Sequence, residues 1–375
     1  MTEALTKSKR IAAIDWMRGF VMILMVLDHV SMAFDGHHFS SDSAGTFKGA
    51  LPGSFEFLTR WATHLCAPTF VFLAGTALAI SVNSRQQRGI RAGAIDKGII
   101  TRGLFILLLD PTLISLFSWR VTFQVLYAIG GAMICMALLR RLSTKLLLGA
   151  SLGWIFFGEL LVRQLWDPTL GNPSIPTALT MGFYYEPFFR ISYPLLPWLS
   201  IMCLGWVFGR YLSERKNPDF KGPEPIPVLV ACGITSLLVF GIVRWVNGYG
   251  NMMLTPAIDG WETVLFVSKY PPSLSYTAQQ LGLLCLILAG MIALEKKVGV
   301  RPNGVLLVFG QTAMFFYLVH RIVLEGLAQW CGLRGFGGIG ITYLITAILL
   351  ILLYPLCRWY RQFKKDHPGG WTSFI

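Results

Sequence analysis

Ten apolar runs alternate with polar connections along the chain, and each is long enough to cross a bilayer as a helix. The Asp110-Pro111 pair predicts a break near the outer end of the third run, and a turn at Trp119 and Arg120 separates it from the fourth. The pattern predicts an all-α fold, a polytopic membrane bundle of about ten transmembrane helices. The runs cover residues 11–34, 58–82, 98–118, 121–139, 145–163, 191–212, 226–245, 273–294, 304–324 and 336–357.

Basic residues are divided unequally between the connections. One side holds 21 Lys and Arg and the other 9, with Arg18 and Arg102 left inside helices. The positive-inside rule therefore predicts that both termini lie in the cytoplasm. Lys7, Lys9 and Arg10 belong to this inner side. No cleavable signal peptide precedes the first run, so we expect that run to stay as a helix. The longer outer connections, residues 35–56, 164–190 and 246–272, predict a substrate-facing surface.

Composition narrows the class of protein. Apolar residues make up 54% of the chain and charged residues 14%, which is typical of a membrane protein and not of a soluble one. The net charge of +13 does not indicate nucleic-acid binding, because the basic residues lie in short loops between apolar runs. The seven cysteines fall almost entirely in apolar runs and predict no disulfide framework. The histidines show no metal-ligand spacing, so no metal is expected.

The first run carries Asp15, Arg18, Asp28 and His29. Arg18 and His29 are eleven residues apart, which returns to within roughly 20° of the same direction, about 16 Å along a helix axis. A guanidinium could hold a carboxylate, a phosphate or a neighbouring helix, and an imidazole could act as a general base. Asp28, on an adjacent face, is a substrate-binding candidate, and it could also pair elsewhere, for example with Arg60. The alternative is a set of buried ion pairs that only fixes helix packing.

Other histidines are candidates for the same outer site. His37 and His38 lie in the first outer connection, where solvated surface is the plainer interpretation. His64 follows Arg60 by four residues, so the two share a helix face, and a structural role for His64 is equally open. Tyr317 and His320 share a face of the ninth run, and His320 is expected at the depth of the first-run histidine.

Two further groups could bind ligands. Arg102, Gln124 and Tyr127 could line a tunnel for a cofactor, although helix–helix hydrogen bonding explains the last two as well. An aromatic and acidic rim at the outer entrance would suit a sugar or lipid headgroup, or simply an interfacial belt. This rim contains Glu186, Arg190, Tyr193 and Trp198, of which Glu186 and Trp198 are substrate-binding candidates. Tyr270, in the rigid turn before the eighth run, is a further candidate.

Five segments carry a family resemblance. In chain order, these segments resemble the bacterial branch of the heparan-alpha-glucosaminide N-acetyltransferase family. They are IDWMRGFVMILMVLDH, HLCAPTFVFLAGTALAI, YPLLPWLSIMCLGWVFGR, KYPPSLSY and FFYLVHR. That family is part of the wider transmembrane acyltransferase superfamily. The resemblance spans nearly the whole chain and is specific for the family rather than for a substrate.

The resemblance implies a bundle of ten or eleven helices that binds acyl-CoA, usually acetyl-CoA, from the cytoplasmic side. The acyl group then passes to an acceptor on the far side. In the related polysaccharide O-acetyltransferases an R-x10-H pair is required, which corresponds here to Arg18 and His29. The heparan enzyme has asparagine in place of His29 and an active histidine in the first outer loop, nearest to His37 and His38. It also has aspartate where this chain has His64, so more than one histidine is a candidate base.

We therefore expect residues 1–375 to form a single transmembrane acyltransferase domain in a bacterial inner membrane. His29, Arg18 and His38 are the expected catalytic residues, and His320 is the other histidine that could orient the base. The expected partners are the bilayer, acyl-CoA and a glycan, amino-sugar or lipid-linked acceptor, with no nucleic acid and with homodimer formation left open. The alternatives are a transporter or flippase of a small solute or lipid-linked sugar and, more weakly, a partner-binding scaffold.

Overall fold

The computed structural model describes residues 11–367 and 369–374 and is 71% helical. The inner basic cluster Lys7, Lys9 and Arg10 lies outside the described residues. In chain order the helices are α1 Ala12–Phe34, α2 Ser54–Thr63, α3 Cys66–Gln87, α4 Ala92–Leu109, α5 Ser115–Ser118, α6 Val125–Leu139, α7 Thr144–Leu165, α8 Ile175–Thr180, α9 Leu195–Glu214, α10 Pro225–Val246, α11 Trp261–Leu265, α12 Leu274–Val298, α13 Val305–Gln311, α14 Ala313–Trp330 and α15 Ile339–Asp366. The remaining elements are η1 Asp110–Ile114, η2 Pro168–Leu170, η3 Gly370–Ser373 and the strands β1 Val121–Phe123, β2 Tyr184–Glu186 and β3 Phe189–Ile191.

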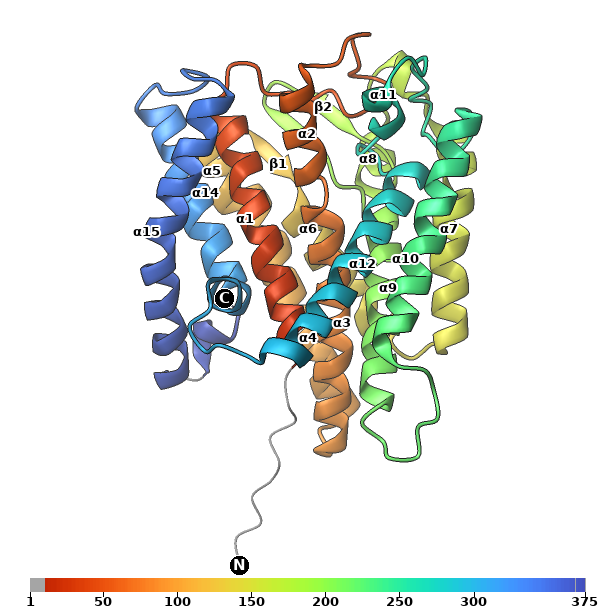
Figure 1. Cartoon of the computed structure of the whole chain (residues 1–375), viewed down its shortest axis with the longest axis vertical. Helices are drawn as coiled ribbons and strands as arrows, with labels where there is room; N and C mark the ends of the chain where they lie inside the picture. Colours follow the sequence, from red (N-terminus) through yellow and green to blue (C-terminus); the bar gives the residue numbers. More distant parts are fainter. Residues whose placement is uncertain (1–10, 368, 375) are drawn as a thin grey trace, which may run out of the picture.

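The predicted all-α membrane fold is confirmed, and the count of about ten is approximate. Within the described residues, eight helices are long and apolar enough to cross a membrane. The pair α13 and α14, bent by 89°, adds one more, and α6 is a shorter apolar helix. Each of the ten predicted runs thus corresponds to a helical segment. The start of α1 and the end of α15 lie at the same end of the bundle, the lower end in Figure 1.

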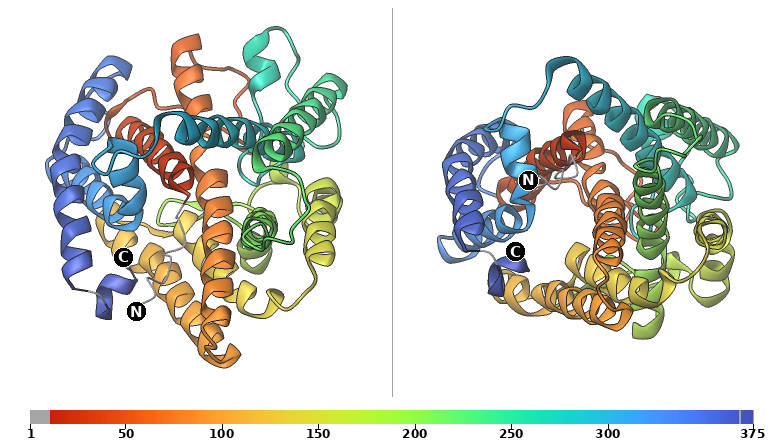
Figure 2. Two further views of the ribbon diagram at one scale, coloured as in Figure 1. Left: turned by 60° about the horizontal axis from the view of Figure 1, so that its bottom comes forward. Right: turned by 90° about the horizontal axis from the view of Figure 1, so that it is seen from below.

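Helix α1 lies inside the bundle and contacts α2, α3, α12, α13, α14 and α15. Viewed from below (Figure 2), α15 lies at one edge of the bundle and α7 at the opposite edge, with α3 between α1 and α9. The large apolar side chains of α7, α10 and α15 point outward, as expected for lipid-facing helices. Polar side chains of α1 are therefore kept away from lipid.

Glycines allow the helices that hold α1 to approach at backbone distance. A Cβ on Gly19 would lie 2.0 Å from the carbonyl oxygen of Leu306, and one on Gly310 would lie 1.9 Å from that of Asp15, so α1 and α13 touch through their backbones. Between α3 and α9, a Cβ on Gly205 would lie 1.9 Å from a main-chain oxygen. Any side chain at these positions would push the helices apart.

The start of α1 is bound by a residue far along the chain. The two carboxylate oxygens of Glu295, on α12, accept from the main-chain N–H groups of Ala12 and Ala13 at 3.1 and 2.7 Å. These donors have no partner within their own helix, and a carboxylate also favours the positive end of the helix dipole. Glu295 therefore fixes the inner end of α1.

Helix breaks occur where the sequence carries polar residues and proline. The predicted interruption at Asp110 is confirmed: α4 passes into the π-helical segment η1, and Asp110 Oδ2 accepts from the main-chain N–H groups of Gln124 and Tyr127, both at 2.8 Å. The second apolar run divides into α2 and α3 at His64, so that Pro68 stands in the first turn of α3, where proline is tolerated.

A small sheet at the outer end was not predicted from the sequence. Its order is β1-β3-β2, with β1 parallel to β3 (Val121 opposite Phe189) and β2 antiparallel to β3 (Tyr184 opposite Ile191). It lies at the upper end of the bundle in Figure 1 and joins the turn after α5 to the long connection before α9.

Candidate functional site

The two ends of α1 present different polar groups. Near the inner end, Arg18 Nη1 donates to Asp15 Oδ1 at 2.9 Å and to the carbonyl oxygen of Gly310 at 3.4 Å. Near the outer end, His29 is half-buried and faces α14. The helix therefore places a cation and an imidazole at two depths of the bundle interior.

His29 and His320 form a direct pair. Nδ1 of His29 lies 2.8 Å from Nε2 of His320, and the two rings stack with centroids 5.1 Å apart. Nδ1 of His320 lies 2.8 Å from the carbonyl oxygen of Phe316. Tyr317 packs edge-on against both rings. The prediction that His320 lies at the depth of His29 is confirmed.

The hydrogen bonds assign the protons of this pair when both rings are neutral. A carbonyl oxygen can only accept, so Nδ1 of His320 carries a proton and its Nε2 is an acceptor. Nδ1 of His29 must then donate to that acceptor, which leaves Nε2 of His29 unprotonated. Nε2 of His29 is therefore the atom of the pair that can receive a proton.

Next to this pair lies a buried network of charges centred on Arg60. Its Nη1 donates to Asp28 Oδ1 at 2.6 Å, which confirms the predicted Asp28–Arg60 pair. Its Nε donates to Asp42 Oδ2 at 2.9 Å, and Nη2 donates to the same oxygen. Thr63 donates to Asp28, and His64 Nε2 lies 3.5 Å from Asp42 Oδ2. Burial alone would raise the pKa of Asp42, but the Arg60 charge outweighs it and holds that pKa well below its usual range.

The two loop histidines differ. His38 Nδ1 lies 2.8 Å from Ser31 Oγ, and burial together with the Arg60 charge lowers the pKa of His38 to about 4. His37 is exposed, and its main-chain N–H donates to Asp35 Oδ1 at 2.9 Å. Both line a cavity of about 10 Å³, room for about one water molecule. His38 is thus neutral at pH 7 and close to α1.

A wide opening lies at the inner end of the bundle. A cavity of about 630 Å³ between α1 and α3 is lined by Arg18 and Asp15 together with Arg85, Arg88 and Lys216. A second hollow of about 620 Å³ shares Lys216 with it and adds further basic side chains. The inner cavity, as we call the first of these, is therefore a basic space reached from the side predicted to be cytoplasmic.

Several predicted ligand residues lie elsewhere. Arg102 is exposed on α4 and does not line the inner cavity. Gln124 precedes α6 at its outer end, where Tyr127 donates to the carbonyl oxygen of Leu179, so neither joins Arg18. The predicted cofactor-binding set is thus not brought together, because α6 begins at the outer face.

The predicted outer rim is also divided. Glu186 is exposed on β2 and accepts from Asn172 Nδ2 at 3.1 Å. Trp198 is fully buried in α9 and packs against Tyr193 and Tyr276, so it belongs to the core and not to an open rim. Tyr270 is buried and packs against Phe183 and Tyr193.

Sequence reasoning missed Lys269 as a site residue. Lys269 is only 3% exposed, and its Nζ lies 5.3 Å from the centroid of the Tyr270 ring. Its main-chain N–H donates to the carbonyl oxygen of Asp42 at 2.9 Å, so it lies next to the Arg60 network. The available signal was a lysine directly before the Tyr270-Pro271 turn in an otherwise apolar setting.

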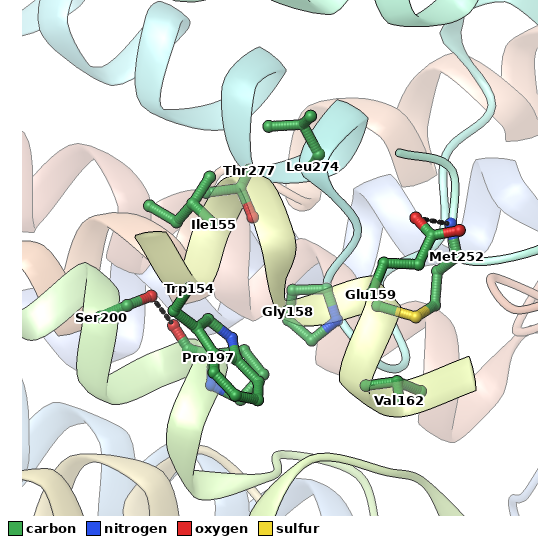
Figure 3. A pocket seen from close by; sticks show the side chains of 11 residues that line it. Trp154, Ile155, Gly158, Glu159, Val162, Pro197, Ser200, Met252, Leu274 and Thr277 are labelled. Carbon is green, nitrogen blue, oxygen red and sulfur yellow. Dashed lines mark hydrogen bonds between the residues drawn. The ribbon is translucent and has the colours of Figure 1, made fainter. Parts of the chain in front are cut away.

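A further small crevice, between α7, α9 and α12 and shown in Figure 3, does not resemble a reaction site. Glu159 is its only carboxylate, and that group accepts from the main-chain N–H groups of Gly250 and Met252 at 2.9 and 3.0 Å. Trp154 and Pro197 fill much of the remaining space, leaving about 10 Å³. The crevice is a packing defect between α7, α9 and α12.

Fold and site together define a multi-pass membrane protein with a basic inner cavity and a buried histidine pair near the opposite face. Residues 10–244 match the family model described as heparan-alpha-glucosaminide N-acetyltransferase, catalytic. The chain belongs to this family of transmembrane acetyltransferases. No curated protein matches the chain.

Proposed function

We propose that the protein transfers an acetyl or related acyl group from cytoplasmic acyl-CoA to a hydroxyl or amine of an acceptor at the outer face. The membrane is proposed to be a bacterial inner membrane, and residues 1–375 a single domain. The observation that carries the proposal is the histidine pair, which leaves Nε2 of His29 as a free base on the same helix as Arg18. Family membership supports the reaction class.

The donor would bind at the inner cavity. Coenzyme A carries several phosphate charges, and Arg85, Arg88 and Lys216 provide cations on the side from which it would enter. The pantetheine arm would run past Arg18 toward His29, and Arg18 would hold a polar group of that arm. Arg102, Gln124 and Tyr127 are not part of this donor site, because they lie away from the inner cavity.

The reaction needs one proton acceptor. The acceptor O–H or N–H loses its proton to Nε2 of His29 while its oxygen or nitrogen forms a bond to the thioester carbonyl carbon. The carbon–sulfur bond then breaks, and the CoA thiolate leaves and takes the proton from Nε2 of His29, which restores the base. His320 accepts the Nδ1–H of His29 and thereby orients the base. Asp28 and His38 line the small outer cavity and would contact the acceptor.

The test uses purified protein in detergent or nanodiscs. Acetyl-CoA should raise the melting temperature of the wild type and of His29→Ala equally, since the variant keeps the donor site. His29→Ala should lose roughly 10²–10⁴-fold in transfer to an envelope extract. His367→Gln, at the exposed end of α15, is the matched control and should behave as wild type.

Two results would reject the proposal. Near-normal transfer by His29→Ala would remove His29 from the mechanism and turn attention to His38. Absence of thermal stabilisation by any acyl-CoA would favour a transporter over an acyltransferase.

A further inference from the structure

Three cations and two aromatic rings alternate at the outer end of the bundle. Arg120 lies 5.3 Å from the centroid of the Tyr185 ring, and Arg190 lies 5.7 Å from the same centroid. Arg190 also lies 6.0 Å from the centroid of Tyr270, over which Lys269 is placed at 5.3 Å. We call Arg120, Tyr185, Arg190, Tyr270 and Lys269 the cationic ladder. Two of its cations share each ring, so it forms one continuous surface.

Within the described part of the chain, the three cations of the ladder lack direct ion-pair partners. Among the described residues, no carboxylate forms an ion pair with Arg120, Arg190 or Lys269. Nε of Arg190 donates to Ser192 Oγ at 2.7 Å, and no described group accepts from its two terminal nitrogens. A buried or half-buried cation is costly without a counter-charge. The planar fork of Arg190 is therefore available for an anion with two acceptor oxygens.

The inner end of the ladder lies against the Arg60 network. Arg60 donates to Asp42 and to Asp28, and Asp28 directly precedes His29 on α1. The main-chain N–H of Lys269 donates to the carbonyl oxygen of Asp42 at 2.9 Å, which fastens this end to the Arg60 network. An anion held by the ladder would thus lie near the network that also binds Asp28, the residue before the proposed base.

The outer end of the ladder opens onto apolar surface. Leu116, Trp119 and Phe188 are 68%, 71% and 78% exposed, and all three flank Arg120 in the sequence or across the β1–β3 pairing. A hollow of about 570 Å³ beside them is lined mainly by Leu116, Phe117, Trp119 and Trp330. Exposed tryptophan and leucine at this height are typical of the outer boundary of a bilayer. A water-soluble glycan would gain nothing from this surface, whereas a lipid chain would.

We propose that the acceptor is a lipid-anchored molecule with a phosphate group next to its reacting hydroxyl or amine. Its chain occupies the apolar hollow, its phosphate binds Arg190 and Lys269, and its head group extends to Nε2 of His29. The inference rests on the proposed acyl transfer and identifies the class of its acceptor. Phosphate is favoured over carboxylate because it is the group that joins polar heads to lipid chains.

The experiment follows radiolabel from acetyl-CoA in nanodiscs that contain the purified full chain. One arm receives the organic lipid extract of bacterial envelopes, separated on an anion-exchange column, and the other receives the aqueous glycan fraction. Label should enter an anionic, phosphate-containing lipid. Arg190→Gln and Lys269→Met should raise KM for that fraction by roughly tenfold to a hundredfold, since each removes a charge-assisted hydrogen bond. Lys48→Gln, an exposed outer cation, is the matched control.

Arg120→Gln is a surface change that does not endanger folding, and it should raise the same KM severalfold. All variants should keep the wild-type thermal stabilisation by acetyl-CoA. Label in the aqueous glycan fraction, with KM unchanged in the ladder variants, would overturn the inference and leave acyl transfer in place. Absence of both label transfer and stabilisation by acetyl-CoA would overturn the proposed function and this inference with it.

Discussion

The histidine pair makes a quantitative prediction about His320. Replacing His320 by leucine removes the acceptor of the His29 Nδ1–H, which lies 2.8 Å away. Between neutral groups that hydrogen bond is worth about 1 kcal/mol, but once His29 has taken a proton it becomes a bond from an imidazolium, worth about 1.5–3 kcal/mol. The bond therefore strengthens by about 0.5–2 kcal/mol as the transition state is approached, and its loss should lower kcat by roughly 2- to 30-fold.

The assay compares His320→Leu with His320→Gln in steady-state transfer from acetyl-CoA. A glutamine carbonyl oxygen can accept from Nδ1 of His29 and its amide can donate toward the Phe316 carbonyl, so this variant should recover most of kcat. KM for acetyl-CoA should stay constant, because the inner cavity does not include His320.

Two outcomes would refute this reasoning. Unchanged kcat in His320→Leu would show that orientation of His29 contributes nothing. A loss as large as that of His29→Ala, with no recovery in His320→Gln, would make His320 itself the base.

Two further predictions concern stability. Gly205→Ala should destabilise the protein by at least about 2–3 kcal/mol, because its Cβ would lie 1.9 Å from a carbonyl oxygen of α3. The control is Gly241→Ala, whose Cβ would meet nothing within 4 Å. Melting temperatures of the two variants in detergent test this, and equal values would contradict the backbone contact. Burial lowers the pKa of His38 in the folded protein to about 4, against 6.5 for the free side chain. As the pH falls, His38 is therefore protonated in the unfolded chain before it is protonated in the folded protein. The stability that neutral His38 contributes is lost as the pH falls from about 6.5 to 4. His38→Gln should show a smaller loss of melting temperature over this pH range than the wild type, and identical curves would refute the assignment.

Much of the fold could be predicted from the sequence because the bilayer imposes one dominant rule. Apolar runs identify the helical segments, and the basic connections predict the orientation. The bend between α13 and α14 and the three-stranded sheet were missed. Both depend on contacts between distant segments, and the strands are three residues each, too short to show a period of two.

The candidate site was predictable where spacing within one helix decides position. Helical periodicity placed Asp28 toward α2 and matched the depths of His29 and His320, and the structure has both pairs. Periodicity gives no information about which helix end faces a cavity. Arg102 and Trp198 were therefore assigned to ligand sites, but Arg102 is exposed on α4 and Trp198 is buried in α9. Lys269 was missed because a single loop lysine has no periodic neighbour.

The binding of α1 by Glu295 has a consequence for biosynthesis. Helix α1 leaves the ribosome before α12 and α14, because the carboxylate that binds its amino end comes 282 residues after Ala13 and the partner of His29 comes 291 residues after it. Helix α1 therefore acquires its final contacts only after these later helices have been inserted. Expression of residues 10–244 alone, the stretch that matches the family model, would accordingly produce a first helix lacking both its anchor and its second imidazole.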